Sequence, residues 1–250
     1  MSKAKAITLS VVGLLAFLSI WEGFSRSGVV KQTLVPPPSS VPTALISEIE
    51  LGFWQEMVMA SLSHYSVGLL IGSVLGILFG VSMALMPRMA ASLAWTVRIL
   101  RPIPPLAWIP FAIIWFGVNE TSAAFIISIG IFWINYFAAL TAVQAVDKDL
   151  IEVAKAFGHR TAYARLTKVI LPAALPGILG GLRTGLGQGW MTVIAAELFG
   201  IPGIGQRMIE ASGLLATDVV ILYMFTIGAL YGVTDYLFVQ VQERLLAWQK

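Results

Sequence analysis

The chain has 250 residues, of which 58% are hydrophobic and only 12% are charged, and its mean hydropathy is +0.85. Soluble domains carry about 25% charged residues, so this composition excludes an ordinary soluble protein and indicates one that crosses a membrane several times. The net charge of +3 is too small, and its cations too dispersed among apolar runs, to indicate a nucleic-acid partner. The absence of cysteine excludes disulfides and thiolate chemistry, and His64 and His159 lie far apart in the sequence, so no metal site is expected.

An apolar run over residues 7–24 follows Lys3 and Lys5, a layout that signal peptides share with first transmembrane helices. No small-residue cleavage site followed by a soluble domain comes after it, so we expect the segment to remain as a membrane anchor. Residues 25–60 contain a proline-rich stretch that favours extended chain, followed by a short amphipathic helix over residues 43–51. We predict that residues 25–60 form an external loop.

Two further spans follow this loop. Residues 61–86 are long enough to cross a bilayer, which takes roughly 20 residues. A third span, residues 89–116, is interrupted by the run RPIPPLAWIP at residues 101–110, because prolines lack the backbone donors of a continuous helix. Broken helices at membrane depth must be surrounded by protein or water.

Polar residues mark the next two spans. The fourth, about residues 122–146, carries Asn135, and the fifth carries Arg183, Gln188 and Glu197. Such side chains are costly in lipid, so we expect these four to face protein or a water-filled cavity, and they are our candidates for a translocation path. For Asn135 a hydrogen bond between helices is an equally good interpretation, and for Arg183 so is pairing with an acidic or carbonyl group.

Glycine recurs at every fourth position in the second and the fifth span. The two stripes are Gly68, Gly72, Gly76 and Gly80, and, within residues 173–199, Gly177, Gly181, Gly185 and Gly189. Residues four apart share one face of a helix, and glycine lets another backbone approach that face closely. We therefore expect each stripe to be buried against a neighbouring helix, and the two stripes are candidates to face each other.

A sixth span covers about residues 218–240, and the loop cations set the orientation. With both termini inside, Arg26, Lys31 and Arg207 lie outside, and the inside cations are Lys3, Lys5, Arg88, Arg98, Arg101, Lys148, Lys155, Arg160, Arg165, Lys168, Arg244 and Lys250. Cytoplasmic loops carry the excess of lysine and arginine. The pattern therefore predicts about six spans with both termini in the cytoplasm.

Residues 146–172 are the one long internal segment with clustered charge. Apolar residues at helical spacing lead to Phe157, Gly158 breaks the run, and a second short helix begins near Thr161. This pattern predicts a helical hairpin on the cytoplasmic side. Because Phe157 lies beside cations such as Lys155, the hairpin is suited to contact another protein and not lipid.

The order Glu152, Ala154, Gly158 and then Leu171-Pro172 resembles the EAA loop of bacterial ABC importer permeases, although Val153 stands where the family usually has its first alanine. The resemblance implies that residues 146–172 are a cytoplasmic coupling loop that docks into a groove on an ATPase. It assigns the contact to Glu152, Ala154, Phe157 and Gly158.

The RPIPPLAWIP run, together with the segment from Trp115 to Ser122, resembles more specifically the branch of these permeases that imports aliphatic sulfonates, taurine, nitrate or bicarbonate. This resemblance implies an all-α, polytopic fold of the type I ABC importer permease, with residues 1–250 forming a single transmembrane domain. It also implies a bacterial inner-membrane location.

The implied function is that of the transmembrane subunit of an ATP-driven importer for a small anionic solute, delivered by an extracytoplasmic binding protein. No G-x-x-x-x-G-K-[ST] motif occurs, so the chain is not expected to be an enzyme or to bind a cofactor, and ATP and magnesium would bind two partner ATPase subunits. Since only one docking hairpin is found, a second copy of the permease would complete a two-fold transporter.

Three alternatives remain. The solute could be nitrate, bicarbonate or another small molecule handled by the same family. An ion-coupled secondary transporter would show inverted repeats and paired membrane carboxylates, which we do not find. An intramembrane enzyme would need acid–base groups such as Glu197, Asp235 and His64, which no sequence spacing brings together.

Overall fold

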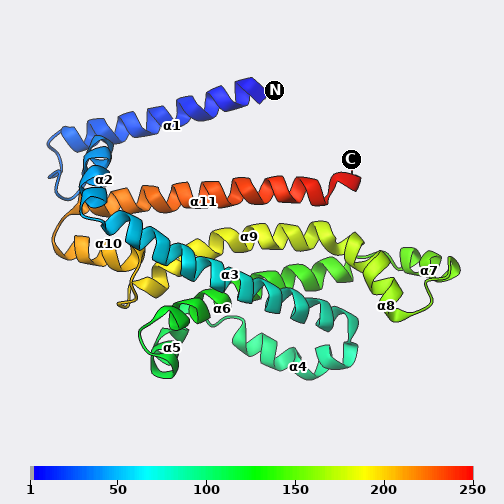
Figure 1. Cartoon of the computed structure of the whole chain (residues 1–250). Helices are drawn as coiled ribbons and strands as arrows, with labels where there is room; N and C mark the ends of the chain where they lie inside the picture. Colours follow the sequence, from blue (N-terminus) through cyan, green and yellow to red (C-terminus); the bar gives the residue numbers. More distant parts are fainter. Residues whose placement is uncertain (1–2, 250) are drawn as a thin grey trace.

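The computed structural model describes residues 3–249, and every regular element in that part of the chain is a helix (Figure 1). Short 3₁₀ and π turns connect some of the helices. The α-helices are α1 (Lys3–Arg26), α2 (Val41–Glu50), α3 (Phe53–Leu85), α4 (Pro87–Leu100), α5 (Ile109–Phe116), α6 (Glu120–Gln144), α7 (Lys148–Ala156), α8 (Ala162–Arg165), α9 (Leu171–Glu197), α10 (Ile204–Gly213) and α11 (Thr217–Leu245).

Within the described residues, five helical stretches are long and apolar enough to cross a membrane. They are Thr8–Arg26, Phe53–Leu85, Glu120–Gln144, Ala162–Glu197 and Thr217–Leu245. A sixth crossing results if α4 and the segment Pro105–Phe116, which are bent by 90° at a short break, are taken as one interrupted span. The expected all-α polytopic fold with about six spans is confirmed.

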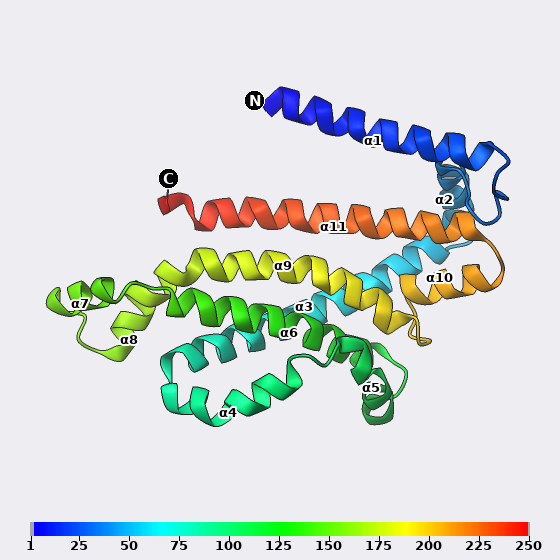
Figure 2. The same ribbon diagram turned by 180° about the vertical axis from the view of Figure 1, so that it is seen from behind.

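The two ends of the bundle differ in what covers them. Figures 1 and 2 show the start of α1, the end of α11 and the projecting α7–α8 segment at one end, which we call the hairpin end. Helices α2 and α10 lie at the opposite end, which we call the α2–α10 end. Lys250, counted among the inside cations, lies outside the described residues.

The second span begins earlier than the sequence pattern predicts. Helix α3 starts at Phe53, directly after Gly52, so the last part of the expected external loop over residues 25–60 is helical. Gly52 has φ of +80°, a left-handed conformation that glycine adopts without strain, and it separates α3 from α2. No proline or glycine follows until Gly68, so nothing in the sequence delays the helix to Ser61.

Helix α6 is the centre of the bundle because both glycine stripes pack against it. A Cβ atom placed on Gly72 or Gly76 would lie 2.6 Å from a backbone oxygen of α6, that of Ser128 or Phe132. Gly68 and Gly80 meet the same helix at Ile127 and Tyr136. The backbones of α3 and α6 are therefore in direct contact along the whole first stripe.

The second stripe packs against another side of α6. A Cβ on Gly177 would lie 2.7 Å from the Cβ of Ala142, and one on Gly181 would overlap Ala138. Gly185 meets the Asn135 side chain, and Gly189 meets Ile131 of α6 and Tyr65 of α3. The two stripes thus do not face each other, since α6 lies between them.

A buried ion pair holds the α2–α10 end together. Arg207 of α10 donates to both carboxylate oxygens of Glu48 of α2, at 3.0 and 2.6 Å, and the hydroxyl of Tyr223 donates to Glu48 at 2.8 Å. The Arg207 guanidinium also lies over the Phe53 ring, 4.3 Å from its centroid. The sequence indicates Arg207 only as an outside cation, because its partner lies 159 residues away.

The net effect of these contacts is a low pKa for Glu48. Burial raises the pKa of this carboxyl, but the hydrogen bonds from Arg207 and Tyr223 and the charge of Arg207 outweigh burial and leave the pKa below its ordinary value. The hydrogen bond to Glu48 likewise raises the pKa of Arg207. Both groups are therefore charged at neutral pH.

We expect Gly72→Ala and Gly181→Ala to lower the stability of the detergent-solubilised protein by about 1–3 kcal/mol, because the added methyl group has no space against α6. Gly180→Ala is the matched control, since no atom lies within 4 Å of a Cβ at that position. Thermal unfolding followed by size-exclusion chromatography measures the difference. Equal melting temperatures for Gly181→Ala and Gly180→Ala would contradict the packing argument.

For Glu48 the expected effect depends on pH. A lowered folded-state pKa gives stability that is complete above the unfolded value of 4.5 and is lost as the pH falls through the folded value. Glu48→Gln should cost about 3 kcal/mol at pH 7, because it leaves Arg207 buried with a weaker partner, and should remove this part of the acid sensitivity. Glu50→Gln, on the same helix but exposed, is the control. Melting temperatures measured from pH 7 to about pH 3 test this, and identical pH profiles for wild type and Glu48→Gln would refute it.

Candidate functional site

The segment between α6 and α9 folds as helix, turn and helix. Helix α7 begins after Asp147, whose side-chain oxygen accepts a hydrogen bond from the Asp149 N–H at 2.9 Å. It ends where Gly158 takes φ of +94° and where the His159 N–H bonds to the Ala154 carbonyl at 2.9 Å. This Schellman-type end, with glycine in the left-handed position, explains physically why the helix stops at Gly158.

The second arm of the hairpin runs into α9 without a break. Thr161 caps α8, because its hydroxyl oxygen accepts from the Ala164 N–H at 3.2 Å. A π turn over Leu166–Ile170 then connects α8 to α9. The hairpin is thereby a continuation of a membrane-spanning helix, and a displacement of one moves the other.

The outer surface of the hairpin exposes large apolar side chains. Phe157 is 82% exposed and Tyr163 76%, and Leu150 and Val153 are also exposed. Ala154, in contrast, is buried. Exposed aromatic residues on a charged segment are typical of a surface that another protein covers.

The root of the hairpin is packed onto the bundle. Ile151 and Leu166 contact a cluster of buried residues that includes Val143 of α6 and Ala174 of α9. Both helices that flank the hairpin thus hold it. The four residues expected to make the docking contact divide accordingly: Glu152 and Phe157 are exposed, Gly158 forms the turn, and Ala154 faces inward.

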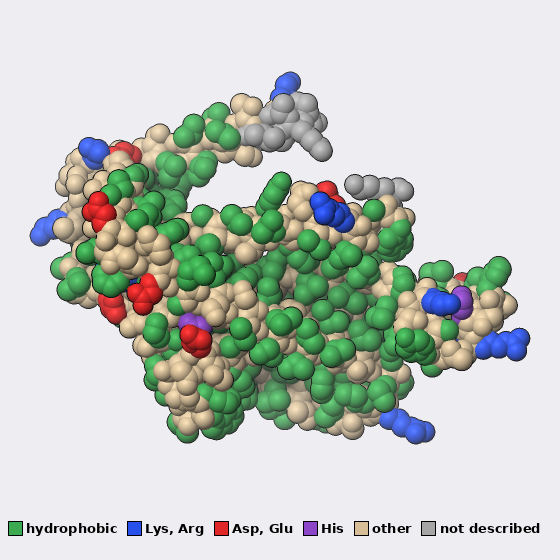
Figure 3. All heavy atoms as spheres, in the orientation of Figure 1, with side chains coloured by type: hydrophobic (Ala, Val, Ile, Leu, Met, Phe, Trp, Pro, Cys, Tyr) green, Lys and Arg blue, Asp and Glu red, His purple; other side chains and the backbone are tan. Residues whose placement is uncertain are grey.

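Charge is distributed unequally between the two ends of the bundle (Figure 3). The hairpin carries the cations Lys148, Lys155, Arg160, Arg165 and Lys168 and the acids Asp147, Asp149 and Glu152. The helices and loop at or near the α2–α10 end carry the acids Glu22, Glu48, Glu50, Glu56, Glu120, Glu210 and Asp218 and the cations Arg26, Lys31 and Arg207. Most of the acidic charge on the bundle therefore lies away from the hairpin.

Arg183 is paired within the chain. Its Nε and Nη2 atoms donate to the two carboxylate oxygens of Asp235 on α11, at 2.7 and 2.8 Å. The pair is bidentate, the strongest arrangement for arginine and carboxylate, although half of the Arg183 side chain remains exposed. The charge of the expected anion-attracting residue is thus already balanced.

Asn135 and Gln188 also bond inside the chain. Asn135 is fully buried, and its side-chain amide donates to the Ser73 hydroxyl of α3 and to the Ile131 carbonyl, both at 3.2 Å. The half-buried Gln188 lies 3.4 Å from the Thr192 hydroxyl on the same helix. In this conformation Asn135 faces no open passage.

Glu197 lies at the centre of a polar network that the sequence did not reveal. Its carboxylate accepts from the Ser61 hydroxyl and the Gly205 N–H at 2.9 Å, and His64 Nδ1 lies 2.9 Å from its other oxygen. Ser61 in turn accepts from the Ile204 N–H. The fully buried Glu197 therefore connects α3, α9 and the start of α10.

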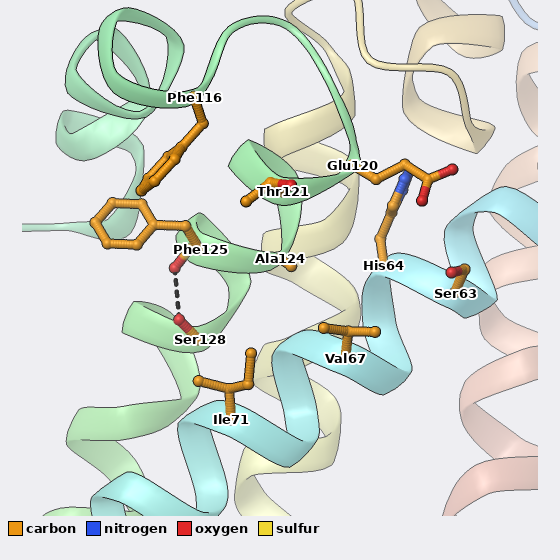
Figure 4. Close-up of a pocket in the computed structure, with 10 residues that line it drawn as sticks. All are labelled: Ser63, His64, Val67, Ile71, Phe116, Glu120, Thr121, Ala124, Phe125 and Ser128. Carbon is orange, nitrogen blue, oxygen red and sulfur yellow. Dashed lines mark hydrogen bonds between the residues drawn. The ribbon is translucent and has the colours of Figure 1, made fainter.

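A pocket of about 350 Å³ adjoins this network, between α3, α6 and the end of α5 (Figure 4). His64 and Glu120 contribute to its lining, and most of the remaining wall is apolar, including Val67, Phe116 and Phe125. His64 Nε2 is buried and has no hydrogen-bond partner among the described residues. The structure thus joins His64 to Glu197, which the sequence spacing did not predict, but Asp235 pairs with Arg183, so the three acid–base groups considered for an enzyme do not form one site.

The chain was compared with known proteins. The family model described as the binding-protein-dependent transport system inner membrane component matches residues 72–247. The taurine transport system permease protein of Escherichia coli (strain K12) is 34% identical over 98% of this chain and 91% of that protein. The bicarbonate transport system permease protein of Synechococcus elongatus is 34% identical over 98% of this chain and 89% of that protein.

The fold has a counterpart among solved structures. A chain from the inward-facing conformations of the MetNI methionine ABC transporter aligns with a TM-score of 0.65 at 21% identity, covering 81% of this chain and 99% of that chain. The family match covers most of the helical bundle, and both relatives extend over nearly the whole sequence. The chain therefore belongs to the family of binding-protein-dependent transport system inner membrane components, the permease proteins of ABC transporters.

Proposed function

We propose that this chain is the transmembrane subunit of an ATP-driven importer for a small anionic solute of the sulfonate or taurine type. The observation that carries the proposal is the hairpin, which projects from a bundle that is otherwise suited to lipid (Figure 1). The hairpin exposes Phe157 and Tyr163. The names of the relatives support the solute class, since taurine carries a sulfonate and bicarbonate is itself an oxyanion. Nitrate, bicarbonate or another small solute of the same family is the alternative.

The proposed partner at the hairpin is an ATPase, and ATP and magnesium bind to that subunit and not to this chain. Phe157 fits a pocket on the partner as an aromatic anchor. Glu152 supplies charge beside it, and Gly158 and Ala154 fix the turn that presents both. One hairpin per chain favours a transporter with two permease copies and two ATPases.

The proposed orientation places the hairpin end in the cytoplasm of a bacterium and the α2–α10 end outside its inner membrane. The cations of the hairpin support this, because lysine and arginine are enriched in cytoplasmic loops. Both termini then lie inside as well, since the start of α1 and the end of α11 lie at the hairpin end. An extracytoplasmic binding protein delivers the solute at the α2–α10 end.

The transport mechanism that fits this arrangement is alternating access. ATP binding closes the two ATPases and moves the docked hairpins together. Each hairpin is continuous with α9 and packed on α6, so its displacement rotates these two helices, and the glycine contacts carry α3 with them. A passage that opens and closes between permease copies follows from such rigid-body motion.

The four polar candidates for the path enter the proposal in different ways. Gln188 is half-buried on the second-stripe helix and can turn toward a passage by changing rotamer. Asn135 and Glu197 act by fixing the helices that move. Arg183 acts through its pair with Asp235, which connects α9 to α11.

We expect Phe157→Ala to weaken association with the ATPase at least tenfold, because loss of an aromatic anchor costs about 2 kcal/mol at an interface. The melting temperature of the isolated permease should not change, since the side chain is 82% exposed. Leu214→Ala, equally exposed in the loop after α10 at the opposite end, is the control. Co-elution and vanadate-sensitive ATP turnover are measured, and wild-type affinity in the Phe157→Ala complex would refute the docking role.

For Arg183 the test is a double substitution. Arg183→Leu leaves Asp235 unpaired inside a span, so we expect a lower yield of assembled protein, and Arg183→Leu combined with Asp235→Leu should restore it. Uptake by the reassembled double variant then distinguishes a structural role of Arg183 from contact between Arg183 and the solute. Near wild-type uptake means that Arg183 acts by pairing, whereas restored assembly without uptake means that it contacts the solute.

A further inference from the structure

The break between α4 and α5 carries two arginines that form no ion pair with any side chain in the part of the chain that the structure describes. Arg98 lies in the last turn of α4 and Arg101 at its C-terminal cap, and both side chains are exposed. From the sequence we expect both to be cytoplasmic loop cations. The structure instead places them beside the interrupted part of a membrane span.

The position of Arg101 relative to the membrane spans follows from its contact with α6. The Arg101 guanidinium lies over the ring of Phe137, 4.2 Å from its centroid. Phe137 is about two turns, or about 10 Å, before the end of α6 at Gln144, in a helix about 37 Å long that exceeds the hydrocarbon layer of about 30 Å. The guanidinium therefore lies beside the membrane-crossing stretch Glu120–Gln144, about two turns from its end.

The two guanidinium groups have aromatic partners but no acidic ones. Arg98 lies over Trp95, 5.3 Å from the ring centroid. None of the ion pairs among the described residues includes Arg98 or Arg101. Between Arg88 and Asp147 the only acidic residue is Glu120, which begins α6 at its other end. Buried or membrane-embedded cations need a counterion, so the counterion here comes from outside the chain.

The geometry suits an oxyanion. A hollow of about 530 Å³ opens between α4 and α6, lined by Ala94, Val97, Arg98, Arg101, Pro102 and Phe137. A guanidinium over an aromatic face is held by a cation–π interaction and keeps N–H donors that match two oxygens of an oxyanion. Arg98 and Arg101 lie about one helical turn apart and line the same hollow.

We infer that Arg98 and Arg101 form a binding site for the oxyanion group of a small solute, such as a sulfonate or a bicarbonate. For the identity of the ligand, this inference rests on the proposed function. Arg98 and Arg101, and not Arg183, then bind the negative charge of the solute, since Arg183 is paired with Asp235. A lipid phosphate shares the same chemistry. The test therefore distinguishes solute from lipid headgroup.

The first experiment measures protection from arginine modification. The complete transporter, with its ATPase, is kept in a maltoside detergent that contains no phosphate and is labelled with phenylglyoxal while methanesulfonate or phosphatidylglycerol is added. Mass spectrometry follows Arg98, Arg101 and, as the matched control, Arg88, which lies in the first turn of α4 and does not line the hollow. We expect methanesulfonate to slow labelling of Arg98 and Arg101 at least threefold and to leave Arg88 unchanged.

The other outcomes are equally decisive. Protection by phosphatidylglycerol alone makes the ligand a lipid headgroup and overturns the solute assignment. No protection, or equal protection of Arg88, overturns the site itself.

The second experiment measures uptake with variants. Arg98→Gln combined with Arg101→Gln should lower uptake of the transported anion at least tenfold in proteoliposomes. Arg101→Lys should show uptake between that of the double variant and that of the wild type, because lysine keeps the charge but lacks the planar fork. Arg88→Gln should transport normally. Co-elution with the ATPase is recorded for every variant: a wild type that neither co-elutes nor transports refutes the proposed function, whereas a co-eluting double variant with normal uptake refutes only the arginine site.

Discussion

The close contact of α6 with α3 on one side and α9 on the other is the constraint on which the rest of the fold depends. In a bilayer, apolar helices gain little from being removed from lipid, so association depends on dispersion and close approach. Glycines at 68, 72, 76 and 80 bring the α3 backbone against that of α6, and the second stripe meets Ala138 and Ala142. The three helices consequently behave as one body, and the hairpin that extends from α6 and α9 is attached to that body.

Polar groups fix the opposite end of this body. The buried Glu197 carboxylate joins Ser61 and His64 of α3 to the first turn of α10, and the Glu48–Arg207 pair joins α10 to α2. Each network satisfies a carboxylate with several donors, which is the condition under which a buried charge is tolerated. Both networks thus connect helices at the end where we propose that the solute is delivered.

The cations of the chain divide into those with a partner in the chain and those without. Arg183 and Arg207 have bidentate carboxylate partners inside the protein. The cations on the hairpin point to the aqueous phase, where solvent screens them. Arg98 and Arg101 are different, because they lie over aromatic rings and no ion pair among the described residues includes them. This difference separates structural arginines from arginines available to a ligand.

The sequence alone determined the class of fold, the positions of the spans, the small-residue faces and the hairpin, because each of these follows from local composition and helical spacing. Hydropathy identifies α6 and α11, and Gly158 ends α7, without knowledge of any neighbour. The tertiary structure alone decided which groups meet: that both glycine stripes pack on α6, that His64 reaches Glu197, that Arg183 pairs with Asp235, and that Arg98 and Arg101 remain unpaired. The residues that meet in these contacts are tens to more than a hundred positions apart in the sequence. Which of them meet depends on how the helices rotate and cross, and no local sequence pattern encodes that.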